Sequence, residues 1–197
     1  TKQKVVEQTL SKNTHQLTSL ALTDELTQIA NRRSFISNVK SEINRYKRNK
    51  QTFTFCLLDI DHFKKVNDQH GHQVGDNVLR QLSALIKKTL REYDHFGRIG
   101  GEEFGILLPD TTAIKADEII NRLRSKIMDT TFNHHNNPVN ITLSIGIIES
   151  WFGCTFEHLY NQSDIALYEA KHNGRNQVVM VAPTQSTIET TTAESKK

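Results

Sequence analysis

Phe53-Thr-Phe-Cys-Leu-Leu-Asp-Ile60 is a short, nearly continuous apolar run that ends in acidic residues. Such a run is typical of a buried β-strand. Further along, Phe96-Gly-Arg-Ile-Gly-Gly-Glu-Glu-Phe-Gly-Ile-Leu-Leu108 contains two strand-like pieces around Gly100-Gly101. A Gly-Gly dipeptide favours a tight hairpin because both of its positions tolerate positive φ. The two stretches together predict a buried strand and an antiparallel strand pair.

The remaining sequence alternates between helical and strand-like segments. Helices are predicted from apolar residues at helical spacing, and a further helix is expected from Phe156 to Lys171. The spaced positions are Phe35, Val39, Ile43 and Tyr46, then Val78, Leu82, Leu85 and Ile86, then Ala113, Ala116, Ile120, Leu123 and Ile127. We expect strands at Ile141–Ile148 and Gln177–Val181. Because the hairpin needs an antiparallel pair, the predicted fold class is α/β (α+β), with a central mixed, mostly antiparallel sheet flanked by helices.

The chain divides into three expected regions. Residues 1–23 place Val6, Leu10, Leu17 and Leu20 near a heptad seam, which predicts a helix that pairs with its copy in a dimer. Residues 24–181 form the expected folded domain, and the Ser/Thr-rich residues 182–197 are expected to be a disordered polar tail. The first residue is Thr1 and no signal-peptide pattern follows, so we expect a piece of a longer protein.

Composition excludes several classes of protein. Of the 197 residues, 36% are hydrophobic and 24% charged, and the net charge of +3 is too small to indicate nucleic-acid binding. No apolar run reaches the roughly 18 residues that span a bilayer. The two cysteines, Cys56 and Cys154, are far apart, which indicates a reduced, cytoplasmic protein without a disulfide framework. The basic run 45–50 is either a phosphate-binding patch or the solvated end of a helix.

Four acidic residues occur at the predicted strand end and at the predicted hairpin. Asp59 and Asp61 flank Ile60, and we expect them to point to opposite sides, so that only one joins a given site. Glu102 and Glu103 follow the two glycines, where a ligand can approach the backbone. A strand-end Asp beside a hairpin Glu makes an all-oxygen site of the kind that Mg²⁺ prefers. The alternative is that these acids are merely solvated at a loop tip.

Basic residues that suit phosphate follow two of the predicted elements. The segment 61–65 comes directly after the strand and offers backbone N–H groups, including that of Phe63, and the charge of Lys64. Lys171 and Arg175 flank Asn173-Gly174 at the end of the predicted last helix. These two either bind phosphate or compensate the helix dipole. Two histidine pairs, His70 with His72 and His134 with His135, lack the spacing of a transition-metal site.

Four blocks of this sequence resemble the GGDEF-domain diguanylate cyclases. They are Asp24-Glu-Leu-Thr-Gln-Ile-Ala-Asn-Arg-Arg33, the block Asp59–Asp76, Gly100-Gly-Glu-Glu-Phe104, and Ala170-Lys-His-Asn-Gly-Arg-Asn176. They occur in the order of the family pattern, from Asp24 to about Val181. The signature is the GGEEF form, with Glu102 in place of Asp. The resemblance implies a palm-like domain related to nucleotidyl cyclases, and an enzyme that joins two GTP molecules into cyclic di-GMP.

The resemblance also implies roles for individual residues. Asp59, Glu102 and the carbonyl of Ile60 would hold Mg²⁺ or Mn²⁺, with two ions per active site. Glu102 would accept the proton of the attacking 3′-hydroxyl, and Glu103 would support the same cluster. The triphosphate would meet Lys64, Lys171 and Arg175, and guanine would meet Asn67 and Asp76. His72 and Phe63 are expected near the nucleotide, although His72 is equally a surface loop residue.

A dimer and a product-binding site are further implications of the resemblance. Each domain would hold one GTP, and two domains would face each other under the control of an upstream sensor. Arg91-Glu-Tyr-Asp94 resembles the family's inhibitory RxxD motif, with Arg122 as a second arginine for bound cyclic di-GMP. Outside this context RxxD is usually a surface ion pair. Two alternatives remain: a silent domain that only binds GTP or cyclic di-GMP, and a cyclase for a hybrid or adenine-containing dinucleotide.

Overall fold

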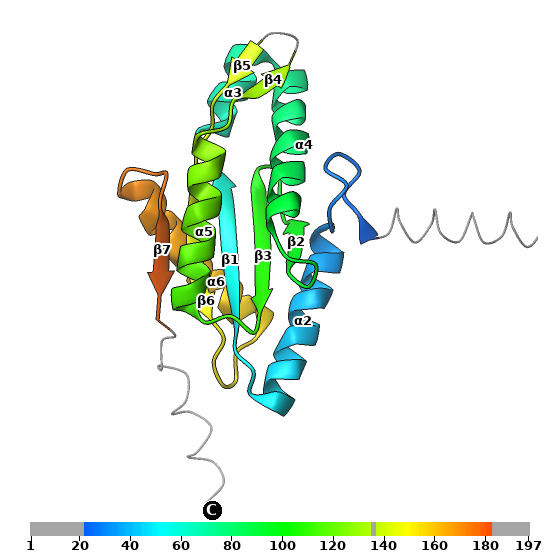
Figure 1. Ribbon diagram of the computed structural model, residues 1–197, viewed down its shortest axis with the longest axis vertical. Coiled ribbons are helices and arrows are strands. Elements are labelled where there is room, and N and C mark those ends of the chain that lie inside the picture. The colour runs from blue at the N-terminus through cyan, green and yellow to red at the C-terminus, as the bar shows by residue number, and fades with distance from the viewer. Residues whose placement is uncertain (1–21, 135–136, 183–197) are drawn as a thin grey trace, which may run out of the picture.

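A five-stranded sheet in the order β2-β3-β1-β6-β7 lies at the centre of the protein (Figure 1). The computed structural model describes residues 22–134 and 137–182. The elements of the sheet are β1 (Phe53–Ile60), β2 (His95–Arg98), β3 (Glu103–Pro109), β6 (Leu143–Glu149) and β7 (Val178–Val181). Three neighbouring pairs are antiparallel and only β6 and β7 are parallel, which confirms the predicted mixed, mostly antiparallel sheet.

Two layers of helices cover the two faces of this sheet (Figure 1). The helices are α2 (Arg32–Asn49), α3 (Phe63–His70), α4 (His72–Thr89), α5 (Ala113–Met128) and α6 (Phe156–His172). On one face, α4 and α5 pack on Cys56, Leu58 and Ile60 of β1. On the other, α2 and α6 pack on Phe53, Phe55 and Leu57. Because both faces are covered, every residue of β1 is buried, which explains its continuous apolar run.

The predicted apolar helix faces are confirmed. The helix α2 buries Phe35, Val39 and Ile43, while Tyr46 packs partly buried against the same core. Cys56 and Cys154 are both buried, and neither forms a disulfide. Within residues 22–134 and 137–182, no helix is long and apolar enough to cross a membrane. Of the predicted N-terminal helix (1–23) and polar tail (182–197), residues 1–21 and 183–197 lie outside the described residues.

The predicted hairpin is present, but the reason given for it was wrong. The strands β2 and β3 pair from His95 with Leu107 to Arg98 with Phe104, and residues 99–102 connect them. Neither Gly100 nor Gly101 has φ in the left-handed region. The connection is longer than a two-residue turn, so it does not need the mirror-image backbone that favours Gly-Gly.

One small feature escaped the sequence analysis, and another, the helix start expected at segment 61–65, differs in extent. A separate two-stranded sheet joins β4 (Phe132–His134) to β5 (Asn137–Val139). The segment after β1 forms a helix of its own, α3, which Gly71 separates from α4 with a φ of 86°. Strands of three residues are too short for a periodic signal. The last turn of α3 and the start of α4 together carry Asn67 and Asp76.

Candidate active site

The end of β1 and the start of β3 bring three carboxylates side by side. Asp59 is the register partner of Glu103 across the antiparallel pair. The amide N–H of Ile60 donates a hydrogen bond of 3.3 Å to the carbonyl of Glu102. The strand pairing therefore places Asp59 and the signature acids together, as the sequence analysis predicted, although they are far apart along the chain.

The first of these acids is buried and paired. Asp59 is 6% exposed, and Lys171 Nζ lies 2.9 Å from its Oδ2 atom. Burial raises the pKa of the Asp59 carboxyl, and the hydrogen bond and charge of Lys171 offset only part of that rise. Lys171 lies in the last turn of α6, so this helix supplies the positive charge next to the strand end.

The two signature glutamates lie in the electrostatic field of Asp59. Burial raises the pKa of Glu102, and the negative charge of Asp59 raises it further. The same two causes, in the same order, raise the pKa of Glu103, and Asp164 of α6 adds to them. Crowded carboxylates that raise one another's pKa values gain free energy when a cation binds between them. The site is therefore negative and suited to a hard metal ion.

The residues present fit a magnesium-type ion. Asp59 and Glu102 could supply carboxylate oxygens, and the main chain of Ile60 could supply a carbonyl. Magnesium in nucleotide sites is held by one or two carboxylates and completes its shell with water and phosphate. In the part of the chain that the structure describes, no three or more His, Cys, Asp and Glu side chains form a metal cluster.

The expectation for Asp61 was wrong in one respect. Asp59 and Asp61 do not point to opposite sides, because residues two apart in an extended chain share one face. Asp59 contacts the end of α6, and Asp61 contacts the turn after it. Asp61 accepts hydrogen bonds from the hydroxyls of Thr142 (2.7 Å) and Ser144 (2.6 Å) and from the amide N–H of Asn176 (3.0 Å). Its carboxylate is thus engaged in positioning β6 and the turn after α6. Only Asp59 is left facing the signature acids.

The residues expected to read guanine lie on two adjacent helices. Asn67 of α3 and Asp76 of α4 are both partly buried. A Cβ atom at Gly75 would collide with Asn67 Oδ1 and would lie 3.3 Å from Phe63 Cζ. The absence of a side chain at Gly75 therefore lets the Asn67 amide rest against α4, one residue from Asp76.

The remaining expected nucleotide contacts differ in exposure. Lys64 and His72 are exposed, and so is Arg175, whose charge lowers the pKa of Asp59. Phe63 is only 5% exposed, and its side chain belongs to the main hydrophobic core. Only the main chain of Phe63 can therefore face a phosphate, as the expected role of segment 61–65 requires.

The expected inhibitory motif borders a cavity. Arg91 and Asp94 lie between α4 and β2. The Arg91 amide N–H donates a hydrogen bond of 2.8 Å to Asp94 Oδ2. The Arg91 guanidinium donates a hydrogen bond to the Tyr93 hydroxyl and lies over the Tyr93 ring. It does not form an ion pair with the Asp94 carboxylate. Both residues line a cavity of about 480 Å³, together with residues of α2, α4 and the segment before α2. Arg122 is exposed on α5 and does not line this cavity.

One acid near the site was missed. Asp164 of α6 raises the pKa values of Glu103 and Tyr160. Asp164 lies seven residues before Lys171, and two helical turns put both on one face of a helix. That spacing could have revealed Asp164, because Lys171 was already expected at the site.

Comparisons with known proteins agree with this arrangement. Residues 21–177 match the family described as "Diguanylate cyclase, GGDEF domain". The diguanylate cyclase DgcP of Pseudomonas aeruginosa is 38% identical over 158 residues, which are 80% of this chain and 24% of that protein. The chain therefore spans about a quarter of the length of this curated relative.

Two solved structures extend the comparison to three dimensions. The coiled coil and GGDEF domain of DgcB from Caulobacter crescentus, in complex with c-di-GMP, superposes with a TM-score of 0.86 at 28% identity, covering 91% of this chain and 96% of that one. The active GGEEF domain of a diguanylate cyclase from Vibrio cholerae has a TM-score of 0.71 at 35% identity, covering 76% and 96%. With these matches over most of its length, the chain belongs to the diguanylate cyclase GGDEF domain family.

Proposed function

We propose that this domain is a diguanylate cyclase, which condenses two GTP molecules into cyclic di-GMP and releases two pyrophosphates. The observation that carries the proposal is the convergence of Asp59 from the end of β1, Glu102 from the turn before β3 and Lys171 from α6. A buried Asp59 beside a partly buried Glu102 suits a divalent cation, and the adjacent ammonium of Lys171 suits phosphate. The relatives named as diguanylate cyclases and the GGEEF domain described as active support the same activity.

The proposed metal site consists of Asp59, Glu102 and the carbonyl of Ile60. It would hold Mg²⁺ or Mn²⁺, and we propose two ions per active site. When bound, such an ion stabilises the negative charge of the phosphates and favours ionisation of the 3′-hydroxyl. Lys171 would exchange its contact with Asp59 for the outer phosphates, where Lys64 and Arg175 join it.

In the proposed reaction, the 3′-oxygen of one GTP attacks the α-phosphorus of the other. Glu102 accepts the hydroxyl proton as the general base. The bond between the α-phosphorus and the bridging oxygen breaks, and pyrophosphate leaves with the electron pair. Glu103 lies beside Glu102 and supports the negative potential of the cluster. Positioning of the two nucleotides supplies much of the remaining acceleration.

Guanine selection is proposed for Asn67 and Asp76. The Asp76 carboxylate accepts from the N1–H and the exocyclic amine of guanine, which adenine does not present together. His72 is exposed beside this pair at the start of α4. We therefore expect GTP and not ATP as the substrate, and competition between the two nucleotides would test this choice.

Assembly and regulation are part of the same proposal. Two domains would face each other as a homodimer, oriented by the residues before Leu22 in response to an upstream sensor, in the cytoplasm. Cyclic di-GMP would bind at Arg91 and Asp94 and inhibit, and Arg122, which lies outside the cavity that these two residues line, would be a second contact. The cavity that Arg91 and Asp94 line supports a ligand there. The DgcB structure in complex with c-di-GMP shows that a related domain binds this dinucleotide.

Incubation of the purified domain with GTP and Mg²⁺, followed by chromatography, tests the proposed activity. The expected products are cyclic di-GMP and pyrophosphate, and Glu102→Gln should lower the rate by about 100-fold or more. Adding cyclic di-GMP back should inhibit the wild type more than Arg91→Ala. GTP binding without turnover at high protein concentration would contradict the proposal and favour a receptor domain.

A further inference from the structure

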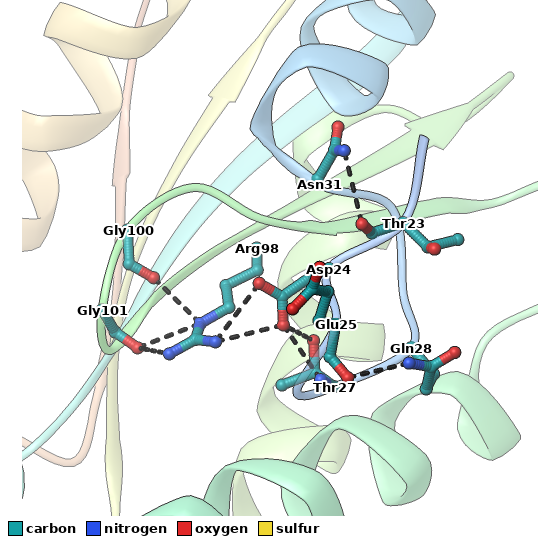
Figure 2. A network of polar contacts seen from close by, with 9 residues as sticks. All are labelled: Thr23, Asp24, Glu25, Thr27, Gln28, Asn31, Arg98, Gly100 and Gly101. Carbon is teal, nitrogen blue, oxygen red and sulfur yellow. Dashed lines mark hydrogen bonds and ion pairs between the residues drawn. The ribbon is translucent and has the colours of Figure 1, made fainter. Parts of the chain in front are cut away.

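The side chain of Arg98 holds the turn that carries the signature glutamates. Arg98 is the last residue of β2, and the turn begins directly after it. Its Nε donates to the carbonyl of Gly100 at 3.1 Å, and its Nη2 donates to the carbonyl of Gly101 at 2.8 Å. Figure 2 shows the guanidinium lying between these carbonyls and the carboxylate of Asp24. One side chain thus fixes two consecutive peptide groups of the turn.

The rest of the turn is held by the main chain. The Glu102 carbonyl accepts from the Ile60 N–H, and the Glu103 carbonyl accepts from the Ile99 N–H at 2.9 Å. Every carbonyl from Gly100 to Glu103 therefore has a donor, and the first two depend on Arg98. Because the peptide of Gly101 precedes Glu102, the position of the Glu102 side chain follows from these contacts.

The third nitrogen of the guanidinium pairs with Asp24. Arg98 Nη1 lies 3.1 Å from Asp24 Oδ1, and the two side chains are 16% and 23% exposed. Asp24 is itself fixed, because its Oδ1 also accepts from the amide N–H of Thr27 (2.9 Å) and from the Thr27 hydroxyl (2.7 Å). The planar fork of arginine matches a carboxylate and two carbonyls at once, whereas a lysine ammonium is a point charge without that geometry.

Asp24 belongs to a closed turn at the start of the described chain. We call residues 22–31 the leading turn. The Asn31 N–H donates to the Leu22 carbonyl at 3.0 Å, and the Arg98 N–H donates to the Ala30 carbonyl at 2.9 Å. Ala30 also forms a parallel bridge with Gly97 on the edge strand β2. The leading turn is therefore attached to β2 by its main chain and to the signature turn through Asp24 and Arg98.

We infer that Arg98 is a positioning residue for the signature turn, residues 99–102. We also infer that its ion pair with Asp24 couples the leading turn to the position of Glu102. The inference rests on the proposed function for its effect on catalysis. A displacement of the leading turn would move Asp24 and therefore Arg98. The carbonyls of Gly100 and Gly101 would lose their donors, and the signature turn would loosen without any change in the nucleotide-binding helices.

The test compares Arg98→Met and Asp24→Asn with the wild type and with Arg45→Met. Arg45 is a matched control, because it pairs with Glu42 and Asp110 and lies in α2, outside the site. Amide hydrogen exchange is measured in peptides that cover residues 99–103 and 22–31. Turnover of GTP and its KM are measured on the same samples. Arg98→Lys serves as the conservative variant that retains charge and loses the fork.

Faster exchange in Arg98→Met, confined to residues 99–103 and 22–31, is the expected result. Its kcat should fall by about 10- to 100-fold with KM for GTP within a few-fold, since a small misplacement of reacting groups is costly. Arg98→Lys and Asp24→Asn should be intermediate, and Arg45→Met should leave exchange at 99–103 and kcat unchanged.

Two results would overturn the role of Arg98. One is unchanged exchange at 99–103 in Arg98→Met, and the other is an increase spread evenly over the molecule, as general destabilisation produces. A wild-type protein that makes no cyclic di-GMP would defeat the proposed function instead. The exchange measurement needs no turnover, so it would still decide whether Arg98 holds the turn.

Discussion

Lys171 Nζ lies 2.9 Å from Asp59 Oδ2, which joins the last turn of α6 to the end of β1. The Asp59 side chain is 8% exposed and that of Lys171 is 33% exposed. A buried carboxylate that has lost its water needs an opposite charge, and the ammonium supplies part of it. In the proposed reaction, the metal ion would take over this role for Asp59 and free Lys171 for phosphate.

Replacement of Lys171 by methionine should destabilise the domain. The change leaves the buried Asp59 carboxylate without its nearest positive group, and we expect a loss of about 1–2 kcal/mol in unfolding free energy, reduced from the fully buried case by the exposure of Lys171. Urea unfolding at neutral pH measures this loss. Lys115→Met, at an exposed position of α5, is the matched control and should change stability by less than about 0.5 kcal/mol.

A double-mutant cycle separates the ion pair from other effects of Lys171→Met. In the background Asp59→Asn, the lysine has no charged partner at that position, so Lys171→Met should cost clearly less. An equal cost in both backgrounds would show that Lys171 stabilises the fold by packing alone.

Glu102→Gln should make the metal-free protein slightly more stable while it removes the proposed activity. Burial and the charge of Asp59 raise the pKa of Glu102 above its ordinary value of 4.5. The folded state then binds the proton more tightly than the unfolded state, so stability falls as pH rises from 4.5 through the raised pKa. An uncharged glutamine escapes this penalty at pH 7. Thermal unfolding without metal measures the effect, and a lower midpoint in Glu102→Gln would contradict it.

The ion pair of Asp24 should give the opposite pH dependence. Burial raises the pKa of Asp24, but hydrogen bonds from Thr27 and Arg98 outweigh burial and leave the pKa below the ordinary value of 3.8. The ionised carboxylate therefore stabilises the fold at pH values above 3.8, and this contribution is lost as pH falls through the lowered pKa. Asp24→Asn should cost about 1 kcal/mol at pH 6, and the difference should shrink below pH 3.8. Urea unfolding of both proteins between pH 3 and 6 checks this, and a constant difference would refute it.

Gly75→Ala should destabilise the domain, although it lies in a helix. Alanine usually stabilises a helix interior by about 1 kcal/mol relative to glycine. Here a Cβ would collide with the Asn67 amide, so we expect a net loss of about 1–3 kcal/mol and weaker GTP binding. Gly101→Ala is the steric control for stability alone, because a Cβ there meets nothing within 4 Å and φ is not in the left-handed region. Calorimetric unfolding and GTP titration measure the two effects, and a stabilised Gly75→Ala would show that Asn67 moves aside freely.

Local patterns predicted much of the fold. Strand β1 coincides with the apolar run Phe53–Ile60, since burial on both faces leaves a signal that needs no knowledge of partners. The buried faces of the helices were predicted from apolar residues at helical spacing, which likewise needs no knowledge of partners. The hairpin was predicted as well, but not the backbone of its glycines, because the length of the connection depends on the pairing of β2 with β3.

The sequence by itself determined the chemistry available at the site: the signature acids, the strand-end Asp59 and the basic residues after α6. Only the tertiary structure decided which of them meet. Asp61 hydrogen-bonds with Thr142, Ser144 and Asn176, and Asp59 faces Lys171, although the two acids are neighbours in the chain. The link between Asp24 and Arg98 likewise had no local signal. Such contacts depend on strand register and helix packing, which join residues far apart in sequence, and no pattern within one segment records them.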